Sequence, residues 1–239
     1  MFLAGVNFAL HCKLLLNGKN QYFSSYEFRY FLGIITVFAL ILFINNASHS
    51  LGWTEDAFRH SLFYAVSIMT TTGYGTVDYT EWAPFAKMLI FALFFVGGSA
   101  GSTGGGIKVI RIMVIMKYIL TEVRKLVHPS AVIPVRIGKK IVIEDKVVQN
   151  TIAFLLLYMS LFLLISIGLS FYDLDIVSAL SVSASAIGNI GPAFGALGPY
   201  DNYAHLASPS KWILCFAMLL GRLEIFTVLI LFSKRFWKK

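Results

Sequence analysis

Long apolar stretches separated by short polar loops dominate the hydrophobic pattern of this chain. Residues 28–46 and 147–170 are almost uninterrupted apolar runs. Each is long enough to cross a bilayer, which takes roughly 20 helical residues. A third stretch, residues 209–234, is long enough to span with some tilt. The pattern therefore predicts three continuous spanning helices.

A fourth apolar stretch is interrupted by glycine. It begins at Ala83, but a glycine-rich segment starts at Gly97, after only about 22 Å of helix. Helical periodicity resumes at Ile107 and continues to about Val127. This pattern predicts a span whose helix is broken in the middle.

Two shorter segments lie between the spans. Residues 55–70 and 174–187 are moderately apolar, contain Ser and Thr, and end in glycine-containing loops. Each would form a helix of roughly 20 Å, too short for a hydrocarbon core of about 30 Å. We therefore expect re-entrant segments, whose irregular ends must line a water-filled cavity or be buried in protein.

A sequence repeat relates the two halves of this pattern. Each half consists of a span, a short helix, a glycine loop and a second span. Two parallel copies predict rotational symmetry about an axis normal to the membrane, along which ions can pass. The matched pairs are Leu62 and Leu180, Ser67 and Ser185, and Gly73 and Gly191 at a shift of 118 residues, with Lys87 and Lys211, and Gly97 and Gly221, at a shift of 124.

These elements predict an all-α membrane protein of tandem span–re-entrant pore helix–span repeats, similar in plan to potassium channels. Pro129, Pro134 and Gly138 lie among β-branched residues and predict a small cytoplasmic hairpin over 132–143, which is either a docking surface or a connector. The expected units are residues 1–27, the end of a preceding membrane helix and a cytoplasmic linker; 28–127, a pore repeat with a broken second helix; 128–146, a cytoplasmic linker; and 147–239, a second pore repeat.

Composition and charge agree with a membrane protein. Hydrophobic residues make up 57% of the 239 residues and charged residues only 13%, so a bilayer is the natural solvent. Sixteen of the twenty Lys and Arg residues lie in the start, the central linker and the tail. Under the positive-inside rule, the linker and C-terminus are cytoplasmic and the re-entrant loops enter from outside. A net charge of +8 could also attract nucleic acid, but the positions of the charges decide the question. They indicate an inner-membrane, multi-pass protein whose basic loops contact lipid, and no nucleic acid is expected.

The cysteines and histidines predict no metal or redox site. Cys12 and Cys215 lie far apart in apolar stretches without a CxxC pair, which indicates buried free thiols. The five histidines are scattered at loops and ends without ligand spacing.

The first glycine loop reads Thr-Thr-Thr-Gly-Tyr-Gly over residues 70–75. A dehydrated K⁺ ion needs a ring of oxygens in place of its water shell, and backbone carbonyls with Thr hydroxyls can supply it. Glycine allows backbone angles that turn successive carbonyls to one side, and the preceding helix directs the negative end of its dipole toward the ion. The alternative is a simple glycine turn. The candidate filter residues are Thr71, Thr72, Gly73 and Tyr74.

The second loop, residues 188–192, occupies the matching place with the sequence Gly-Asn-Ile-Gly-Pro. Asn189 can offer a side-chain carbonyl where the first loop has Thr71, and Gly191 is in register with Gly73. The second set of candidate filter residues is therefore Asn189, Ile190 and Gly191. Potassium, the transported ion, is the only metal expected, and no covalently bound cofactor is expected.

The glycine-rich segment 97–106 is similar to two motifs of soluble enzymes, a P-loop and a nucleophile elbow. A phosphate-binding P-loop needs Lys directly after the last Gly, where Ile107 stands. A nucleophile elbow centred on Ser99 needs a preceding strand and triad partners, but helix precedes it here. Six glycines in mid-membrane indicate a flexible peptide under the filter, or a plain helix break. The candidate gate residues are Gly97, Gly98, Ser99, Gly101, Ser102, Thr103, Gly104, Gly105 and Gly106.

Arg222 is expected deep in the last span, about 20 Å from its start. An ionised side chain at that depth is costly and by default functional. At a shift of 124 it aligns within one residue of Gly98, so both are expected at one level of the pore. Arg222 is therefore a further candidate gate residue that repels cations or holds loop carbonyls; the alternative is a structural ion pair.

These motifs resemble the Trk/Ktr/HKT superfamily of potassium transporters, most closely the Trk H-type subunit. The resemblance rests on TTTGYG at 70–75, GGSAGSTGGGIKVIRI at 97–112, NIGP at 189–192 and GRLEIFTVL at 221–229, and it spans nearly the whole chain.

The resemblance implies four such repeats around a single pore, of which residues 28–127 and 147–239 are the third and fourth. It identifies Gly73 and Gly191 as filter glycines, and residues 97–106 as a gate with Arg222 beside it. It also implies a homodimer of complete subunits and a cytosolic nucleotide-binding regulatory ring, the only component expected to bind nucleotide.

The chain departs from this pattern because it holds only two repeats. Residues 1–11 resemble the end of the second repeat's last helix, so we expect the C-terminal half of a longer or split protein; the alternative is that two copies pair. The expected function is K⁺ uptake by the pore-forming subunit of a Trk-type transporter, which is not an enzyme. The alternatives are a tandem-pore-unit potassium channel, a purely structural membrane subunit and, remotely, an intramembrane serine hydrolase using Ser99.

Overall fold

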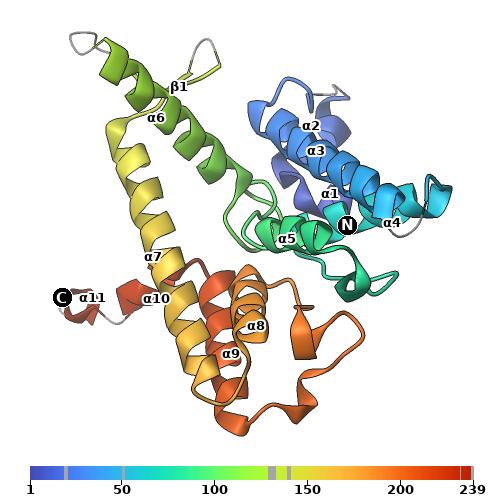
Figure 1. Cartoon of the computed structure of the whole chain (residues 1–239). Helices are drawn as coiled ribbons and strands as arrows, with labels where there is room; N and C mark the ends of the chain where they lie inside the picture. Colours follow the sequence, from blue (N-terminus) through green and yellow to red (C-terminus); the bar gives the residue numbers. More distant parts are fainter. Residues whose placement is uncertain (19–20, 50–51, 129–132, 139–140, 232, 238–239) are drawn as a thin grey trace.

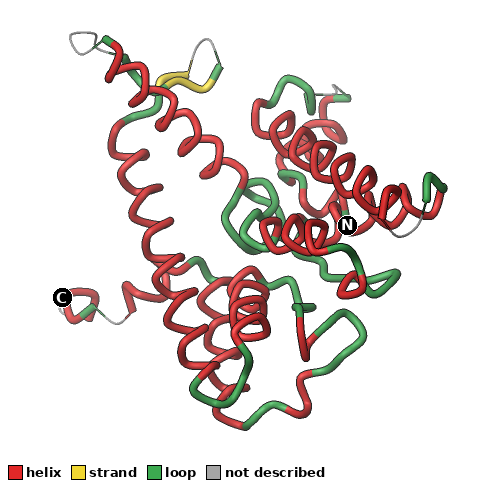
Figure 2. Tube along the Cα trace, viewed as in Figure 1, coloured by secondary structure: helices red, strands yellow, loops and turns green. Residues whose placement is uncertain are grey.

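The computed structural model describes residues 1–239 except 19–20, 50–51, 129–132, 139–140, 232 and 238–239. Helices account for nearly all of its regular structure (Figure 2), as expected for an all-α protein. The elements are α1 (Phe2–Gly5), α2 (Phe8–Asn17), α3 (Tyr26–His49), α4 (Glu55–Met69), η1 (Tyr79–Glu81), α5 (Pro84–Leu93), α6 (Val109–Val127), β1 (Arg136–Ile137), β2 (Ile141–Val142), α7 (Asp145–Ser170), α8 (Ile176–Gly188), η2 (Gly195–Leu197), η3 (Tyr203–His205), α9 (Ser208–Arg222), α10 (Ile225–Leu231) and α11 (Lys234–Trp237).

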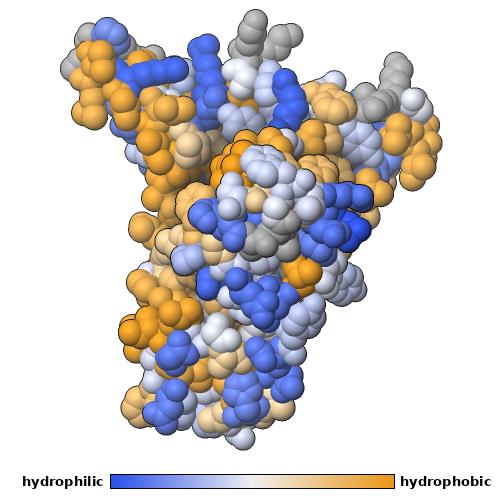
Figure 3. Space-filling view, turned by 45° about the vertical axis from the view of Figure 1, so that its right-hand side comes forward, coloured by the Kyte–Doolittle hydropathy of each residue, from blue (hydrophilic) through white to orange (hydrophobic). Residues whose placement is uncertain are grey.

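Two helices, α3 and α7, are each long and apolar enough to cross a membrane on their own. Large apolar side chains such as Val37, Ile44, Leu156 and Leu164 are exposed on them. Figure 3 shows hydrophobic surface of this kind along one flank of the molecule, with hydrophilic side chains at its upper end. Such a surface is favourable where lipid covers it, and the predicted first and second spans are confirmed.

The predicted continuous span over residues 209–234 is wrong. α9 ends at Arg222, α10 begins at Ile225, and the two helices are bent by 108° at this break. The cause is local: Glu224 has a φ of 58°, a left-handed conformation that ends a right-handed helix. Arg222 therefore lies at the end of a helix rather than in the middle of one.

The predicted break in the fourth apolar stretch is present. α5 ends at Leu93 and α6 begins at Val109, and the glycine-rich segment lies between them. Val96 and Ile107 form an isolated parallel bridge at the base of this segment, so the two ends of the loop lie side by side. The segment is therefore a loop that returns to where it starts.

The short helices α4 and α8 are held by the long ones. α4 packs on α3, and α8 packs against both α7 and α9 (Figure 1). One hydrophobic core runs through both halves of the chain and includes the fully buried Phe31, Tyr64, Phe94 and Val182. A shared core of this kind holds the ends of α4 and α8 in a fixed relation to each other.

The predicted hairpin is present as an antiparallel pair in which Arg136 lies opposite Val142. The start of the predicted range, up to residue 132, and the turn 139–140 lie outside the described residues. Val135, Ile137 and Ile143 form a small core with α6 and α7, so the hairpin is anchored to the long helices.

Cys12 and Cys215 are free, as predicted, but both are exposed in this chain rather than buried. The prediction took apolar surroundings to mean a protein interior. In a membrane protein apolar surface also faces outward, which explains the error.

Candidate functional site

The first candidate filter loop follows directly from the end of α4. Two main-chain amides, those of Thr72 and Gly73, donate to the same carbonyl oxygen of Ser67, at 2.9 and 3.3 Å. This fold-back requires unusual backbone angles: Thr71 has a φ of 53° and Gly73 a φ of 73°. The chain thus turns back over the carboxyl end of the short helix, where the helix dipole is negative.

The second candidate loop repeats this geometry at the end of α8. The amide of Ile190 donates to the carbonyl oxygen of Ser185 at 2.9 Å. Asn189 has a φ of 56°, and Gly191 a φ of 116°. The shift of 118 residues that relates the sequences therefore also relates the left-handed residues, Thr71 with Asn189, and their hydrogen bonds.

The loops that lead away from the filter are also equivalent, at the shift of 124 residues. The Lys87 ammonium donates to the Thr80 carbonyl oxygen at 3.2 Å, and the Lys211 ammonium donates to the Ala204 carbonyl oxygen at 2.7 Å. In both loops a short 3₁₀ helix, η1 or η3, precedes the second span. The two lysines are therefore matched structural clamps on the same turn.

The two candidate filter loops are in direct contact although 118 residues separate them. A Cβ atom on Gly73 would collide with the Ile190 carbonyl oxygen and lie 2.9 Å from the ring of Pro192. The Tyr79 hydroxyl donates to the Ala193 carbonyl oxygen at 2.7 Å and ties the outer parts of the loops together. Only glycine at position 73 allows this approach.

Some carbonyl groups of the loops are already used. The Ser67 hydroxyl donates to the Tyr74 carbonyl oxygen at 2.7 Å, and the Tyr203 hydroxyl donates to the Gly191 carbonyl oxygen at 2.6 Å. Burial raises the pKa of Tyr203 to about 12, so its hydroxyl stays protonated and can donate. Within the described residues no recorded hydrogen bond reaches the main-chain oxygens of Thr71, Thr72, Gly73, Asn189 or Ile190.

These main-chain oxygens are the ligand atoms that the site offers to a cation. No group of three His, Cys, Asp or Glu side chains that could hold a metal occurs among the described residues. The polar side chains of Thr71, Thr72 and Asn189 are used internally. The Thr71 hydroxyl accepts from the Gly105 amide at 2.8 Å, the Thr70 and Thr72 hydroxyls lie 2.8 Å apart, and the Asn189 amide group donates to the Met218 carbonyl oxygen at 3.1 Å.

The glycine-rich loop touches the inner ends of both candidate filter loops. The Gly105 amide donates to Thr71, as above, and a Cβ atom on Gly105 would collide with the Gly188 carbonyl oxygen at the end of α8. A Cβ atom on Gly104 would lie 3.3 Å from the Thr70 carbonyl oxygen. A side chain is excluded at Gly105 and would be crowded at Gly104, so the loop lies as bare backbone against the candidate filter loops.

Residues of the first helices anchor the opposite side of this loop. The Ser99 amide donates to the Gly5 carbonyl oxygen at 2.9 Å, and the Ala100 amide donates to a Glu27 carboxylate oxygen at 2.5 Å. The sequence reasoning missed Glu27. The signal was available, because Glu27 is an acidic residue directly before an apolar span.

Arg222 reaches the loop from α9. Its guanidinium donates to the Thr103 carbonyl oxygen at 2.6 Å, which matches the predicted carbonyl-holding arrangement, and it forms no salt bridge with a described residue. Lys108 donates to the Gly104 carbonyl oxygen. Both cations hold the loop through main-chain oxygens.

An ion pair closes the same region. The Arg111 guanidinium of α6 lies 2.9 Å from a carboxylate oxygen of Glu224, which is in the break between α9 and α10. A cavity of about 340 Å³ is lined by these two residues together with Lys108, Arg222 and the glycine loop. The sequence reasoning missed Lys108, Arg111 and Glu224. For Lys108 and Arg111 a usable signal was present, because both are basic residues directly after the glycine-rich segment.

The hydrolase alternative finds no support in the geometry. Ser99 is buried, and its hydroxyl has no hydrogen-bond partner among the described residues. A nucleophilic serine needs a base within hydrogen-bond reach and access to substrate. Ser99 is instead a packing residue at the start of the loop.

The whole chain, residues 1–239, matches the family described as "TrkH: Cation transport protein". Trk system potassium uptake protein TrkH of Halomonas elongata is 39% identical over 244 residues, which cover 100% of this chain and 49% of that protein. The TrkH protein of Escherichia coli strain K12 is 33% identical over 245 residues, again 100% of this chain and 49% of that protein. The crystal structure of the potassium transporter TrkH from Vibrio parahaemolyticus matches with a TM-score of 0.90 at 35% identity, over 99% of this chain and 51% of that chain.

The chain thus spans about half the length of the relatives that it matches. Its apolar helices and this similarity show a multi-pass membrane protein, and the relatives are transporters rather than enzymes. The match extends over the entire sequence at identities well above those of chance similarity. The chain belongs to the TrkH family of cation transport proteins.

Proposed function

We propose that this chain supplies two of the filter loops of a potassium uptake pathway, as part of the pore-forming subunit of a Trk-type transporter. The observation that carries the proposal is the pairing of the loops at Gly73 and Gly191. They have matched left-handed residues, lie in contact, and leave main-chain oxygens that no recorded hydrogen bond reaches from a described residue. A cation that enters between these oxygens would take the place of the missing donors.

Selection in this arrangement comes from main-chain oxygens. Neutral carbonyl groups replace the water shell of K⁺ without binding it too tightly to leave. The hydroxyls of Thr71 and Thr72 act indirectly, because their hydrogen bonds to Gly105 and Thr70 hold the backbone in place. Tyr74 also helps to hold the backbone, because its main-chain carbonyl oxygen accepts a hydrogen bond from the Ser67 hydroxyl.

We assign the gate to the glycine loop 97–106. The loop lies against the inner ends of both filter loops through Gly104 and Gly105, so it obstructs the inner side of the pathway. Arg222 and Lys108 place two positive charges beside it, which disfavours cations there while the loop is held. Release of these carbonyl contacts would let the loop move and the ion pass.

A complete pathway requires more filter loops than this chain contains. The expected units, 1–27, 28–127, 128–146 and 147–239, supply two pore repeats, and an N-terminal half or a second copy would supply the others. By resemblance, complete subunits form a homodimer in the inner membrane and bind a cytosolic nucleotide-binding ring. The linker and C-terminus would then be cytoplasmic, which the excess of Lys and Arg supports.

The test is ion uptake by the complete transporter in cells that lack other K⁺ importers. Gly73→Ser adds a Cβ atom at a left-handed position where it meets the Ile190 carbonyl oxygen. We expect selectivity for K⁺ over Na⁺ to fall by roughly tenfold, the effect of about 1.4 kcal/mol in relative binding. Gly18→Ser is the matched control, because Gly18 also has a left-handed backbone but nothing lies within 4 Å of a Cβ atom there. A folded, membrane-inserted Gly73→Ser protein with unchanged selectivity would refute the filter assignment.

A further inference from the structure

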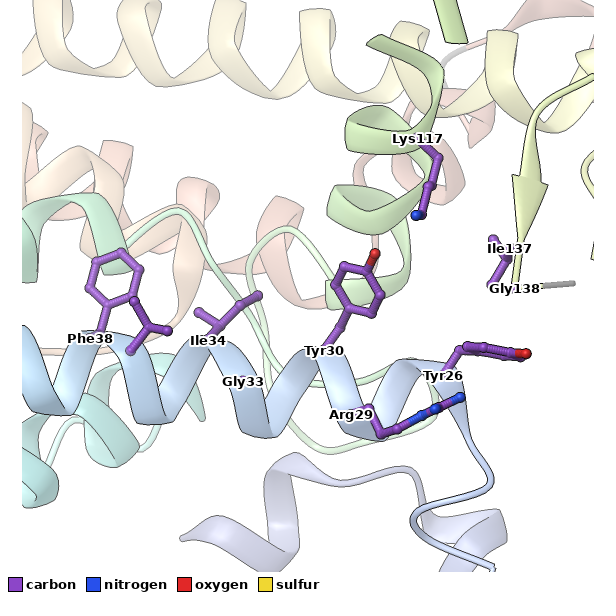
Figure 4. A pocket seen from close by; sticks show the side chains of 10 residues that line it. Tyr26, Arg29, Tyr30, Gly33, Ile34, Phe38, Lys117, Ile137 and Gly138 are labelled. Atoms are coloured by element: carbon purple, nitrogen blue, oxygen red, sulfur yellow. The ribbon is translucent and has the colours of Figure 1, made fainter. Parts of the chain in front are cut away.

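A groove lies between α3, α6 and β1, away from the ion pathway (Figure 4). Its volume is about 560 Å³. Tyr26 and Arg29 line one end together with Lys117, whereas Ile34 and Phe38 line the rest. Figure 4 shows these α3 side chains in order along one helix, with Lys117 extending toward them from α6. The groove therefore has a cationic end and an apolar end.

The cationic end has no counter-charge among the described residues. Arg29 and Lys117 come from different helices, none of the described residues that line the groove is acidic, and neither cation is in a salt bridge with one of them. The Arg29 guanidinium lies 4.4 Å from the ring centre of Tyr26, which orients it but leaves its charge. Two cations that line the same end of one groove from two helices favour an anion at that end.

The apolar end continues the groove along α3 toward the centre of the membrane. From Tyr26 to Phe38 the helix rises about 18 Å, and the apolar part from Gly33 to Phe38 takes about 8 Å of this, enough for part of an acyl chain. Gly33 lies in the middle of this stretch, and a Cβ atom there would meet nothing within 4 Å. Val37, next along the groove, is 53% exposed. A continuous apolar path therefore runs from the cations toward the centre of the membrane.

The position of the hairpin gives the groove its end wall. Gly138 packs so closely on the ring of Tyr26 that a Cβ atom would collide with it. The wall stands on the side of the basic linker, where the lipid head groups of the inner leaflet lie in the proposed topology. Tyrosine at this level is typical of membrane interfaces.

We propose that this groove binds an anionic phospholipid, with its phosphate at the end lined by Arg29 and Lys117 and an acyl chain along Gly33, Ile34, Val37 and Phe38. Basic pockets between membrane helices on the cytoplasmic side are chemically suited to such head groups. The lipid joins α3 to α6 and to the hairpin. The inference rests on the membrane topology of the proposed function but not on the filter or gate.

The first experiment measures lipid retention by the complete transporter in native mass spectrometry, with phosphatidylglycerol and phosphatidylethanolamine supplied at equal amounts. For Arg29→Gln with Lys117→Gln we expect retention of phosphatidylglycerol to fall by roughly thirtyfold, from the usual contribution of two cations near an anionic head group. Retention of phosphatidylethanolamine should stay the same. Lys13→Gln with Lys146→Gln is the control, because it removes equal charge from exposed positions outside the groove.

The second experiment fills the apolar end. Gly33→Leu places a side chain in open space and should displace phosphatidylglycerol without harming the fold, whereas Gly33→Ala should retain it. The proposal would be overturned if wild type, the Arg29→Gln with Lys117→Gln variant and Gly33→Leu all retained phosphatidylglycerol equally. It would also be overturned by equal binding of both lipids, by displacement by inorganic phosphate alone, or by efficient cross-linking of two copies through Val37→Cys, which would make a second protomer the occupant. K⁺ uptake is scored separately, so failure here leaves the filter assignment standing.

Discussion

The two halves of this chain build the same candidate filter loop but interrupt the following helix in different ways. In the first half a long loop separates Leu93 from Val109, and its left-handed positions, Gly101 and Gly106, are glycines. In the second half only residues 223 and 224 separate α9 from α10, and the left-handed position is Glu224. The first break is long and made of glycine, whereas the second is short and charged.

The proposed function explains why the two regions differ. The candidate filter loops keep the same fold-back on Ser67 and Ser185, and in the proposed pathway they must, because coordinating carbonyls have to point in one direction. Below the filter no such requirement holds, and the halves diverge into complementary parts. One half supplies a loop, and the other supplies Arg222, which holds that loop at Thr103.

The largest effect is expected from Gly221 and Gly97, which are equivalent at the shift of 124 residues. A Cβ atom at either position would collide with a carbonyl oxygen, that of Ile187 in the one case and that of Gly105 in the other. Ile187 is in the packed end of α8 and cannot give way, whereas Gly105 is in the loop. Gly221→Ala should therefore cost about 3 kcal/mol of stability, with loss of uptake, and Gly97→Ala clearly less.

The measurements are the melting temperature and the K⁺ uptake of the complete transporter. Gly33→Ala serves as the control, since its Cβ atom meets nothing and alanine favours a helix by about 1 kcal/mol. If Gly97→Ala destabilises the protein as much as Gly221→Ala, the glycine loop is as rigid as the pore helix. The contrast between the two halves would then be false.

A smaller effect is expected from the contact that joins the halves. Arg222→Ala removes the hydrogen bond to the Thr103 carbonyl oxygen and one positive charge beside the loop. A hydrogen bond from a charged donor contributes about 1.5 kcal/mol at the lower end of its range, which suits this exposed side chain. Uptake should therefore increase several-fold, up to roughly tenfold, with unchanged selectivity. Arg222→Lys, which keeps the charge, should lie between; lower uptake in Arg222→Ala would contradict a holding role.

The sequence predicted the elements that follow from the periodicity and length of its apolar stretches. The spans α3 and α7, the short helices α4 and α8, the hairpin and the glycine break all come from local patterns. The internal repeat placed Gly73 opposite Gly191, and the two loops are indeed in contact. That success has a physical basis, because equivalent sequences fold into equivalent loops around a common axis.

The sequence did not predict features that depend on one backbone angle or on distant partners. The bend at Glu224 is set by a φ of 58° at a residue that is otherwise helix-compatible, within an apolar run that appears continuous. The hydrogen bonds from the Ala100 amide to Glu27 and from Arg111 to Glu224 join residues 73 and 113 positions apart. No periodicity in the chain records such pairs.

The smallest effect is expected at the bend itself, where two substitutions separate strain from charge. Glu224→Gly relieves a left-handed conformation that costs a side chain about 1–2 kcal/mol, but it also removes the ion pair with Arg111, which contributes at most about 1 kcal/mol because Glu224 is half exposed. Glu224→Gln removes only the charge. Arg111 keeps a second contact, 3.9 Å from the ring centre of Phe154, so little else should change.

The melting temperature of the complete transporter should therefore rise slightly or stay level in Glu224→Gly and fall slightly in Glu224→Gln. That order follows from the first half of the chain, which uses glycine at its own left-handed positions, Gly101 and Gly106. The reverse order would mean that the carboxylate, and not the backbone angle, holds the bend. The second break would then be an electrostatic clamp across α6 and α9, unlike anything in the first.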